Sequence, residues 1–343
     1  MNSNNSILKN TLKVKDLTFN FMPGWWAKYH GIKFGEKYYT DPEYRMKTTA
    51  CIRKLQKDEM GDLLINEPDL SEIPVGPDYG NATTGAFAGC EVQFPEDGAA
   101  WNKRLPEEKL KDIRLPEKLE ESYPYQGMIE QVLYMNEKYG RRDLPTILPR
   151  GILNEAFLIG GEKILTDMYD DPDEARRVLD FSFELLRMTV EYNASLGYRG
   201  LVRVLNCTVK LIGPDMYKEW LLPYDMRIYE LAAKHNMTFG VHHCGRLDPV
   251  MDHYRSIPEF RYLQMGFGSD LEKAIALFPE AELRYVIDPF FCMNASPNEI
   301  SEKIEDILKQ AGDNAKYIAI DVGAIDYGTP IENLRAIKET LSN

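Results

Sequence analysis

Short apolar runs alternate along the chain with longer segments in which apolar residues recur every three or four positions. The short runs have the length of buried strands, and the longer segments have the period of amphipathic helices. Repeated strand–helix units predict a parallel sheet covered by helices. The runs that we interpret as strands are residues 63–65, 146–148, 201–205, 238–241, 262–265, 285–287 and 318–320.

Capping residues mark the ends of several predicted helices. Asp171 and Pro172 open a long amphipathic helix that ends before Gly197. Residues 296–299 (SPNE) form a capping box, and residues 329–332 (TPIE) open the last helix in the same way. With seven strands visible and an eighth expected between residues 80 and 130, the pattern predicts an α/β fold, a closed (β/α)8 TIM barrel. A doubly wound open sheet is the alternative, and the lack of GxGxxG after a strand weakens its nucleotide-binding form.

The predicted elements fit one domain over residues 1–343. We expect the barrel to begin near residue 55, after an N-terminal extension of residues 1–54. Residues 74–104 are rich in Gly, Asn and Thr, which indicates a long loop with a hairpin near residues 86–94. Such a loop serves either as a lid or substrate wall, or as a surface excursion without a role.

Composition narrows the possible partners. The net charge of −13 makes nonspecific binding to nucleic acid or anionic membranes unfavourable. No apolar run is long enough to span a bilayer. Five cysteines, an odd number, and a polar N-terminus without a signal sequence lead us to expect a reducing, cytoplasmic location.

Soft metal ligands gather in one segment, residues 241–245 (VHHCG). His242 and Cys244 are two residues apart, so on a continuing strand they point to the same face. An imidazole nitrogen and a thiolate make half of a tetrahedral zinc site, and the C-terminal ends of barrel strands are where TIM barrels carry chemistry. We therefore expect these two residues to bind zinc, against the alternative of a buried thiol and solvated imidazoles.

His242-x-Cys244-Gly245 resembles the zinc motif of the uroporphyrinogen decarboxylase-like superfamily, and in particular of its zinc-dependent corrinoid methyltransferases. The likeness covers residues 140–343 well and the first 140 residues poorly. It implies a TIM barrel whose zinc acts on the heteroatom of a methylated substrate, with a corrinoid carrier protein as partner. Other segments that resemble this family are residues 157–161 (FLIGG), 214–220 (PDMYKEW), 287–289 (IDP) and 317–321 (YIAID).

The resemblance leaves the third zinc ligand open. In the methyltransferases a Cys follows the eighth strand, but an ungapped comparison puts Gly323 at that position. Asp321, two residues earlier, and Cys292, after the seventh strand, are equal candidates to replace it. Cys207, after strand 201–205, is a weaker third choice. Without the family's second Cys the zinc would be harder, which favours an ether oxygen over a thiolate as the group it holds.

Aromatic residues near the N-terminus are candidate substrate contacts. Trp25, Trp26, Tyr29 and His30 lie together in residues 22–30 (MPGWWAKYH) and have the rings to stack on an aromatic substrate or a corrin. The alternative, which we favour for the Trp pair, is an apolar plug at the barrel's end. The arginine-rich N-terminal motif of the decarboxylases is missing, which counts against porphyrinogen decarboxylation.

The sequence thus predicts a cytoplasmic zinc methyltransferase. We expect it to move a methyl group from a small substrate to the Co(I) corrinoid of a partner protein. The preferred substrate class is an aryl methyl ether, so the chain would be the demethylating component of an O-demethylase system. The corrinoid-binding pattern Asp-x-His-x-x-Gly is absent, so a separate carrier must bring the corrinoid. The alternatives are a thiol or amine corrinoid methyltransferase, a tetrapyrrole decarboxylase, and a non-catalytic binding protein on the same barrel.

Overall fold

The computed structural model of the chain describes residues 12–64 and 76–342. Its strands are β1 (Asp16–Phe21), β2 (Val92–Gln93), β3 (Trp101–Asn102), β4 (Leu201–Leu205), β5 (Thr238–His242), β6 (Tyr262–Met265), β7 (Glu282–Ile287) and β8 (Ala319–Ile325). Among the helices it describes, none has the length and apolar character needed to cross a membrane.

The helices occur mainly between the strands and after them. The α-helices are α2 (Pro23–His30), α3 (Gly35–Thr40), α4 (Pro42–Met60), α5 (Ala82–Phe87), α6 (Glu107–Leu110), α7 (Tyr125–Tyr139), α8 (Ile152–Gly160), α9 (Lys163–Asp170), α10 (Pro172–Ser195), α11 (Pro214–Met216), α12 (Leu222–Lys234), α13 (Asp248–Tyr254), α14 (Leu271–Leu277), α15 (Pro289–Asn294), α16 (Pro297–Ala311) and α17 (Ile331–Ser342). Shorter 3₁₀ or π turns are η1 (Cys207–Leu211), η2 (Tyr217–Leu221) and η3 (Gly312–Tyr317).

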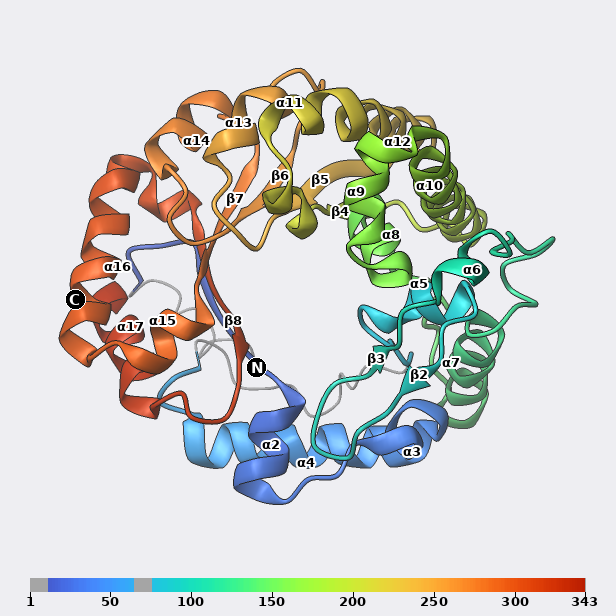
Figure 1. Cartoon of the computed structure of the whole chain (residues 1–343). Helices are drawn as coiled ribbons and strands as arrows, with labels where there is room; N and C mark the ends of the chain where they lie inside the picture. The colour runs from blue at the N-terminus through green and yellow to red at the C-terminus, as the bar shows by residue number, and fades with distance from the viewer. Residues whose placement is uncertain (1–11, 65–75, 343) are drawn as a thin grey trace.

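The main sheet has six parallel strands in the order β1-β8-β7-β6-β5-β4. Its curved half-circle faces α8, α5 and the β2–β3 hairpin on the opposite side of the ring (Figure 1). α2, α3 and α4 lie along the lower edge of the ring in this view, and most of the other helices lie around the outside. This is the (β/α) arrangement of a TIM barrel, as the strand–helix alternation predicts. The C-terminal ends of all six strands therefore open towards the same end of the barrel.

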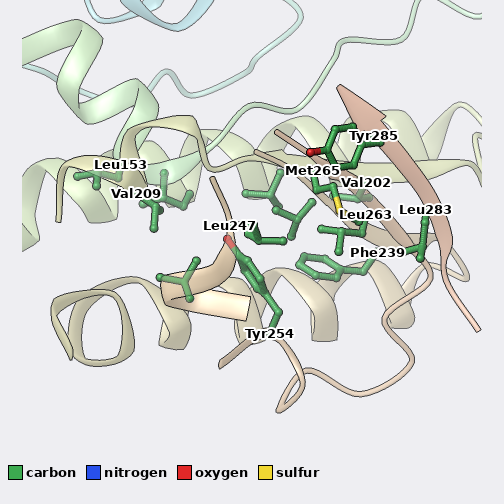
Figure 2. Close-up of a cluster of buried hydrophobic side chains, with 14 of the residues drawn as sticks. Leu153, Val202, Val209, Phe239, Leu247, Tyr254, Leu263, Met265, Leu283 and Tyr285 are labelled. Atoms are coloured by element: carbon green, nitrogen blue, oxygen red, sulfur yellow. The ribbon is translucent and has the colours of Figure 1, made fainter. Parts of the chain in front are cut away.

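The two faces of the sheet differ in chemistry. Alternate residues on β4 to β7 point outwards and are buried against the helices; Figure 2 shows Val202, Phe239, Leu263 and Leu283 with Tyr254 of α13 in this cluster. The intervening residues point into the barrel and stay partly accessible, and several are polar or charged. The barrel is thus held together by its outer apolar layer, which leaves the inner face free for a binding site.

Two predicted strands are not strands in the structure. Residues 146–148 are irregular because the Asn193 side chain, and not a neighbouring strand, binds the backbone of Ile147 through both its N–H and its C=O. Of residues 63–65, Leu63 ends the turn after α4, Leu64 is irregular, and residue 65 lies outside the described residues. A short apolar run does not reveal which group will form hydrogen bonds with its backbone N–H and C=O groups.

The N-terminal region contributes a strand that the sequence analysis did not predict. β1, within the expected extension, pairs in parallel with β8, Asp16 with Ala319 and Thr18 with Asp321. Its alternation of Leu17, Phe19 and Phe21 with polar residues was the available signal. The predicted hairpin near residues 86–94 is displaced: α5 occupies residues 82–87, and β2 pairs with β3 further along.

Candidate metal centre

Three side chains of kinds that can bind a metal meet at the C-terminal ends of β4 and β5. The Sγ atoms of Cys207 and Cys244 are 2.6 Å apart, and His242 Nε2 lies 3.0 Å from the Cys244 sulfur. All three ligand atoms lie within 4.8 Å of one another, and both cysteines are free thiols. Cys244 is exposed, whereas Cys207 and His242 are half-buried, so the cluster is reachable from solvent.

Neighbouring strands explain why these residues meet. β4 and β5 run side by side with Leu205 opposite His242, so the residues that follow each strand emerge together. The Asn206 N–H donates to the carbonyl of His242 at 2.8 Å, which fixes the start of the turn that carries Cys207. The Asn206 side chain in turn donates to buried Asp225 at 2.8 Å. Burial raises the pKa of Asp225 to about 7, although Tyr217 and Asn206 hydrogen-bond to it.

Gln264 on β6 fixes the orientation of the His242 ring. Its amide nitrogen donates to the carboxylate of Asp321 at 2.6 Å, so its oxygen must face His242 Nδ1, which lies 2.7 Å away. The oxygen can only accept, so Nδ1 carries the proton and Nε2 presents a lone pair towards the two sulfurs. This is the tautomer that a metal bound at Nε2 requires, supported by the kind of outer hydrogen bond typical of metal-binding histidines.

Asp321, an expected ligand, lies outside the Cys/His cluster and supports it through Gln264. Its carboxylate receives Arg284 Nη2 at 2.6 Å and Nε at 2.8 Å, and a short hydrogen bond from Thr18. Burial alone would raise its pKa, but Arg284 and Thr18 outweigh burial, and the pKa is lowered. The carboxylate is therefore ionised and engaged by protein donors.

Cys292, the other expected third ligand, is also outside the cluster. It is fully buried on α15, where burial raises its thiol pKa to about 12. An apolar environment of this kind disfavours the thiolate that binds metal. The structure therefore brings His242 and Cys244 together with Cys207, the weakest of the sequence candidates, and not with Cys292 or Asp321.

The two clustered thiols influence each other's ionisation. The hydrogen bond from Cys244 lowers the pKa of Cys207, and neighbouring His242 acts in the same direction. The same bond raises the pKa of Cys244, because that thiol would have to ionise beside an existing thiolate. The pair therefore releases its first proton easily and its second with difficulty unless a cation is present.

The N-terminal aromatic residues occupy a different part of the fold. Trp25 and Trp26 on α2 are 5% and 3% exposed and pack against Phe21. Tyr29 is exposed and accepts a hydrogen bond from the Gly328 N–H, and His30 Nε2 lies 3.6 Å from a carboxylate oxygen of Glu59. Burial of the Trp pair supports an anchoring role, and substrate contact by Tyr29 or His30 stays a prediction.

Comparisons with known proteins agree with this architecture. The sequence model described as uroporphyrinogen decarboxylase (URO-D) matches residues 82–343. No curated protein matches the sequence. Among solved structures, a methyltransferase from Methanosarcina mazei is similar in fold, with a TM-score of 0.64 and 17% identity, over 98% of this chain and 96% of that one. Since the family match extends over well more than half of the sequence, the chain belongs to the uroporphyrinogen decarboxylase (URO-D) family.

Proposed function

We propose that the chain is a zinc-dependent methyltransferase with Cys207, His242 and Cys244 as the zinc ligands. The observation that carries the proposal is the convergence of one imidazole nitrogen and two sulfurs at the C-terminal end of the barrel. Three protein ligands leave one position of a tetrahedral zinc open, which is typical of catalytic and not of structural sites. The fold shared with a methyltransferase is consistent with this proposal.

The side chains around the cluster suit such a metal. Gln264 keeps the proton of His242 on Nδ1, so Nε2 is free to bind. The lowered pKa of Cys207 supplies a thiolate near neutral pH, and the exposure of Cys244 lets a substrate approach. Zinc bound there supplies a Lewis acid for the heteroatom from which the methyl group departs.

The methyl acceptor, in this proposal, is the Co(I) corrinoid of a separate carrier protein. Transfer requires a stronger nucleophile towards methyl than any side chain in this sequence, and cofactors supply such chemistry. The chain lacks the Asp-x-His-x-x-Gly pattern, so the carrier must bring the corrinoid. The barrel end that carries the cluster is where the carrier would deliver it.

In this proposal Cys207 supplies the second sulfur in place of the family's Cys after the eighth strand. A zinc with two sulfur ligands would not be the harder metal that favours an ether oxygen over a thiolate. We keep an aryl methyl ether as the first donor to test, since zinc can hold a phenolic oxygen as it leaves, with thioethers and amines as alternatives. Tetrapyrrole decarboxylation, the activity in the family's name, is the second candidate function.

Methyl transfer from a donor panel tests the proposal. Zinc-loaded protein is mixed with methoxylated phenols, methylamines or methyl thioethers and a Co(I) corrinoid, and the corrinoid absorbance is followed. We expect transfer that stops on zinc removal, returns on its restoration, and is lost in Cys244→Ala but kept in Cys51→Ala, a variant of an exposed cysteine on α4. Carbon dioxide release from a tetrapyrrole, with no transfer from any donor, would establish the decarboxylase instead.

A further inference from the structure

Arg203 points into the barrel, and no carboxylate of the described residues forms an ion pair with it. It lies in the middle of β4, on the face that looks into the barrel, and is half-buried. Among the described residues, its guanidinium makes a long hydrogen bond of 3.4 Å from Nη1 to the side-chain oxygen of Gln264. Within residues 12–64 and 76–342, no carboxylate oxygen comes within 4.0 Å of its guanidinium. Charged groups taken out of water are normally paired, so this arrangement calls for an anion.

The charged residues that β1, β7 and β8 place on the inner face are paired with one another. Arg284 binds Asp321 and lies 3.3 Å from Glu282 and 3.6 Å from Asp16. Glu282 also binds Lys15 at 2.9 Å. These pairs engage the carboxylates that β1, β7 and β8 place on the inner face. Arg203 is left as a donor group with free capacity, since a guanidinium offers five N–H groups.

The position of Arg203 relates it to the metal centre. Its Nη1 and His242 Nδ1 contact the same oxygen of Gln264, at 3.4 Å and 2.7 Å. The residue opposite Arg203 on β5 is Gly240, and the Tyr262 side chain of β6 lies over the place that a Cβ of Gly240 would take. The guanidinium therefore lies on the Nδ1 side of the His242 ring, whereas the Cys244 sulfur lies on the Nε2 side.

We propose that Arg203 binds a carboxylate of the methyl donor, so that the substrate class is a small methylated carboxylic acid such as a methoxybenzoate. The methylated end of this substrate rests on the proposed function. Its acidic end rests on Arg203 alone. A guanidinium and a carboxylate match in a planar, two-bond geometry that is strong and directional. Anchoring the acid at Arg203 would hold the methylated heteroatom at the cluster, which is how positioning contributes to rate.

Calorimetric binding of matched probes tests the anchor without any turnover. The probes are 4-methoxybenzoate, 3-methoxybenzoate, methoxyacetate and dimethylglycine, with 4-methoxybenzamide as the uncharged match of the first. We expect the wild-type protein to bind at least one acid, and to prefer 4-methoxybenzoate to its amide at least tenfold. Arg203→Met should abolish the preference, Arg203→Lys should keep part of it, and Arg261→Met, a surface arginine before β6, should leave it unchanged.

A thermal readout separates binding from a structural role. Removing an unpaired, half-buried charge should leave the Tm of Arg203→Met unchanged or raised, because no ion pair is lost. Methoxybenzoate should raise the Tm of the wild-type protein and not that of Arg203→Met. A lower Tm for the variant with an unaltered acid preference, or failure of every acid to bind the wild-type protein, would overturn the proposal.

Parallel measurements distinguish this proposal from the proposed function. If the protein binds acids through Arg203 but neither retains zinc nor transfers methyl, the carboxylate-binding role of Arg203 is supported and the proposed methyltransferase function is refuted. If zinc-dependent methyl transfer is as efficient from uncharged ethers as from the corresponding acids, the methyltransferase function is supported and the role of Arg203 is refuted. An amine acid such as dimethylglycine outperforming every ether would keep the acid anchor and change the heteroatom.

Discussion

Replacing Gln264 with Leu tests whether the hydrogen bond to His242 prepares the ring for metal. The leucine removes the acceptor that lies 2.7 Å from Nδ1, so the imidazole is free to rotate and to carry its proton on Nε2. Loss of an outer-shell partner of this kind weakens metal affinity by roughly 10- to 100-fold, which is about 1.4–2.7 kcal/mol. All three ligands stay present, so the variant should still bind zinc.

The hydrogen bonds of Asp321 should survive this substitution, whereas Arg203 loses its long hydrogen bond to Gln264. Asp321 keeps Arg284 and Thr18 as donors, so no unpaired carboxylate is created. Asp321→Asn alters the next residue in the series of hydrogen bonds from His242 through Gln264 to Asp321. We expect it to weaken zinc binding less than Gln264→Leu does. Gln126→Leu, which alters a surface glutamine hydrogen-bonded to Glu130, is the matched control.

Competition with a chromophoric chelator measures the zinc dissociation constants of all three variants. The expected order of weakening is Gln264→Leu, then Asp321→Asn, with Gln126→Leu equal to wild type. A zinc dissociation constant for Gln264→Leu within twofold of the wild-type value would refute the reasoning. Complete loss of zinc together with a lower Tm would mean that Gln264 supports the barrel and not only the ring.

Three further outcomes follow from the structure. By elemental analysis, Cys207→Ala should lose stoichiometric zinc and Cys292→Ala should retain it. The opposite result would mean that Cys292, and not Cys207, is a zinc ligand. Burial raises the pKa of Glu155 to about 7 from 4.5, so the unfolded chain binds fewer protons between those values and stability falls as pH rises through this window. Glu155→Gln should flatten that dependence and gain about 3 kcal/mol of unfolding free energy at pH 8 in urea titrations, and an unchanged pH profile would contradict this. Trp26→Ala should cost about 3–5 kcal/mol in the same titrations with unaltered zinc affinity, as for a core anchor, whereas unchanged stability with weaker substrate binding would favour a substrate contact.

Local patterns in the sequence were sufficient for the architecture of the C-terminal two thirds. Strands 201–205 and 262–265 have the predicted bounds, and the capping box at Ser296 and Glu299 is present. Such features depend on neighbours two to four residues away, which a sequence displays directly. β1 was missed although its alternation is visible, because its partner β8 is about 300 residues distant along the chain.

The same distinction applies to the metal centre. The proximity of His242 and Cys244 could be inferred from their spacing at a strand end. The third side chain could not, because it depends on which strand lies beside β5; reasoning from β7 and β8 favoured Cys292 and Asp321, whereas β4 brings Cys207. The sequence by itself therefore determined the fold class, the family and two of the three members of the cluster. Only the tertiary structure decided the third member, the hydrogen bonds that orient His242 and the unpaired charge of Arg203, because these are contacts between strands and a sequence does not specify strand neighbours.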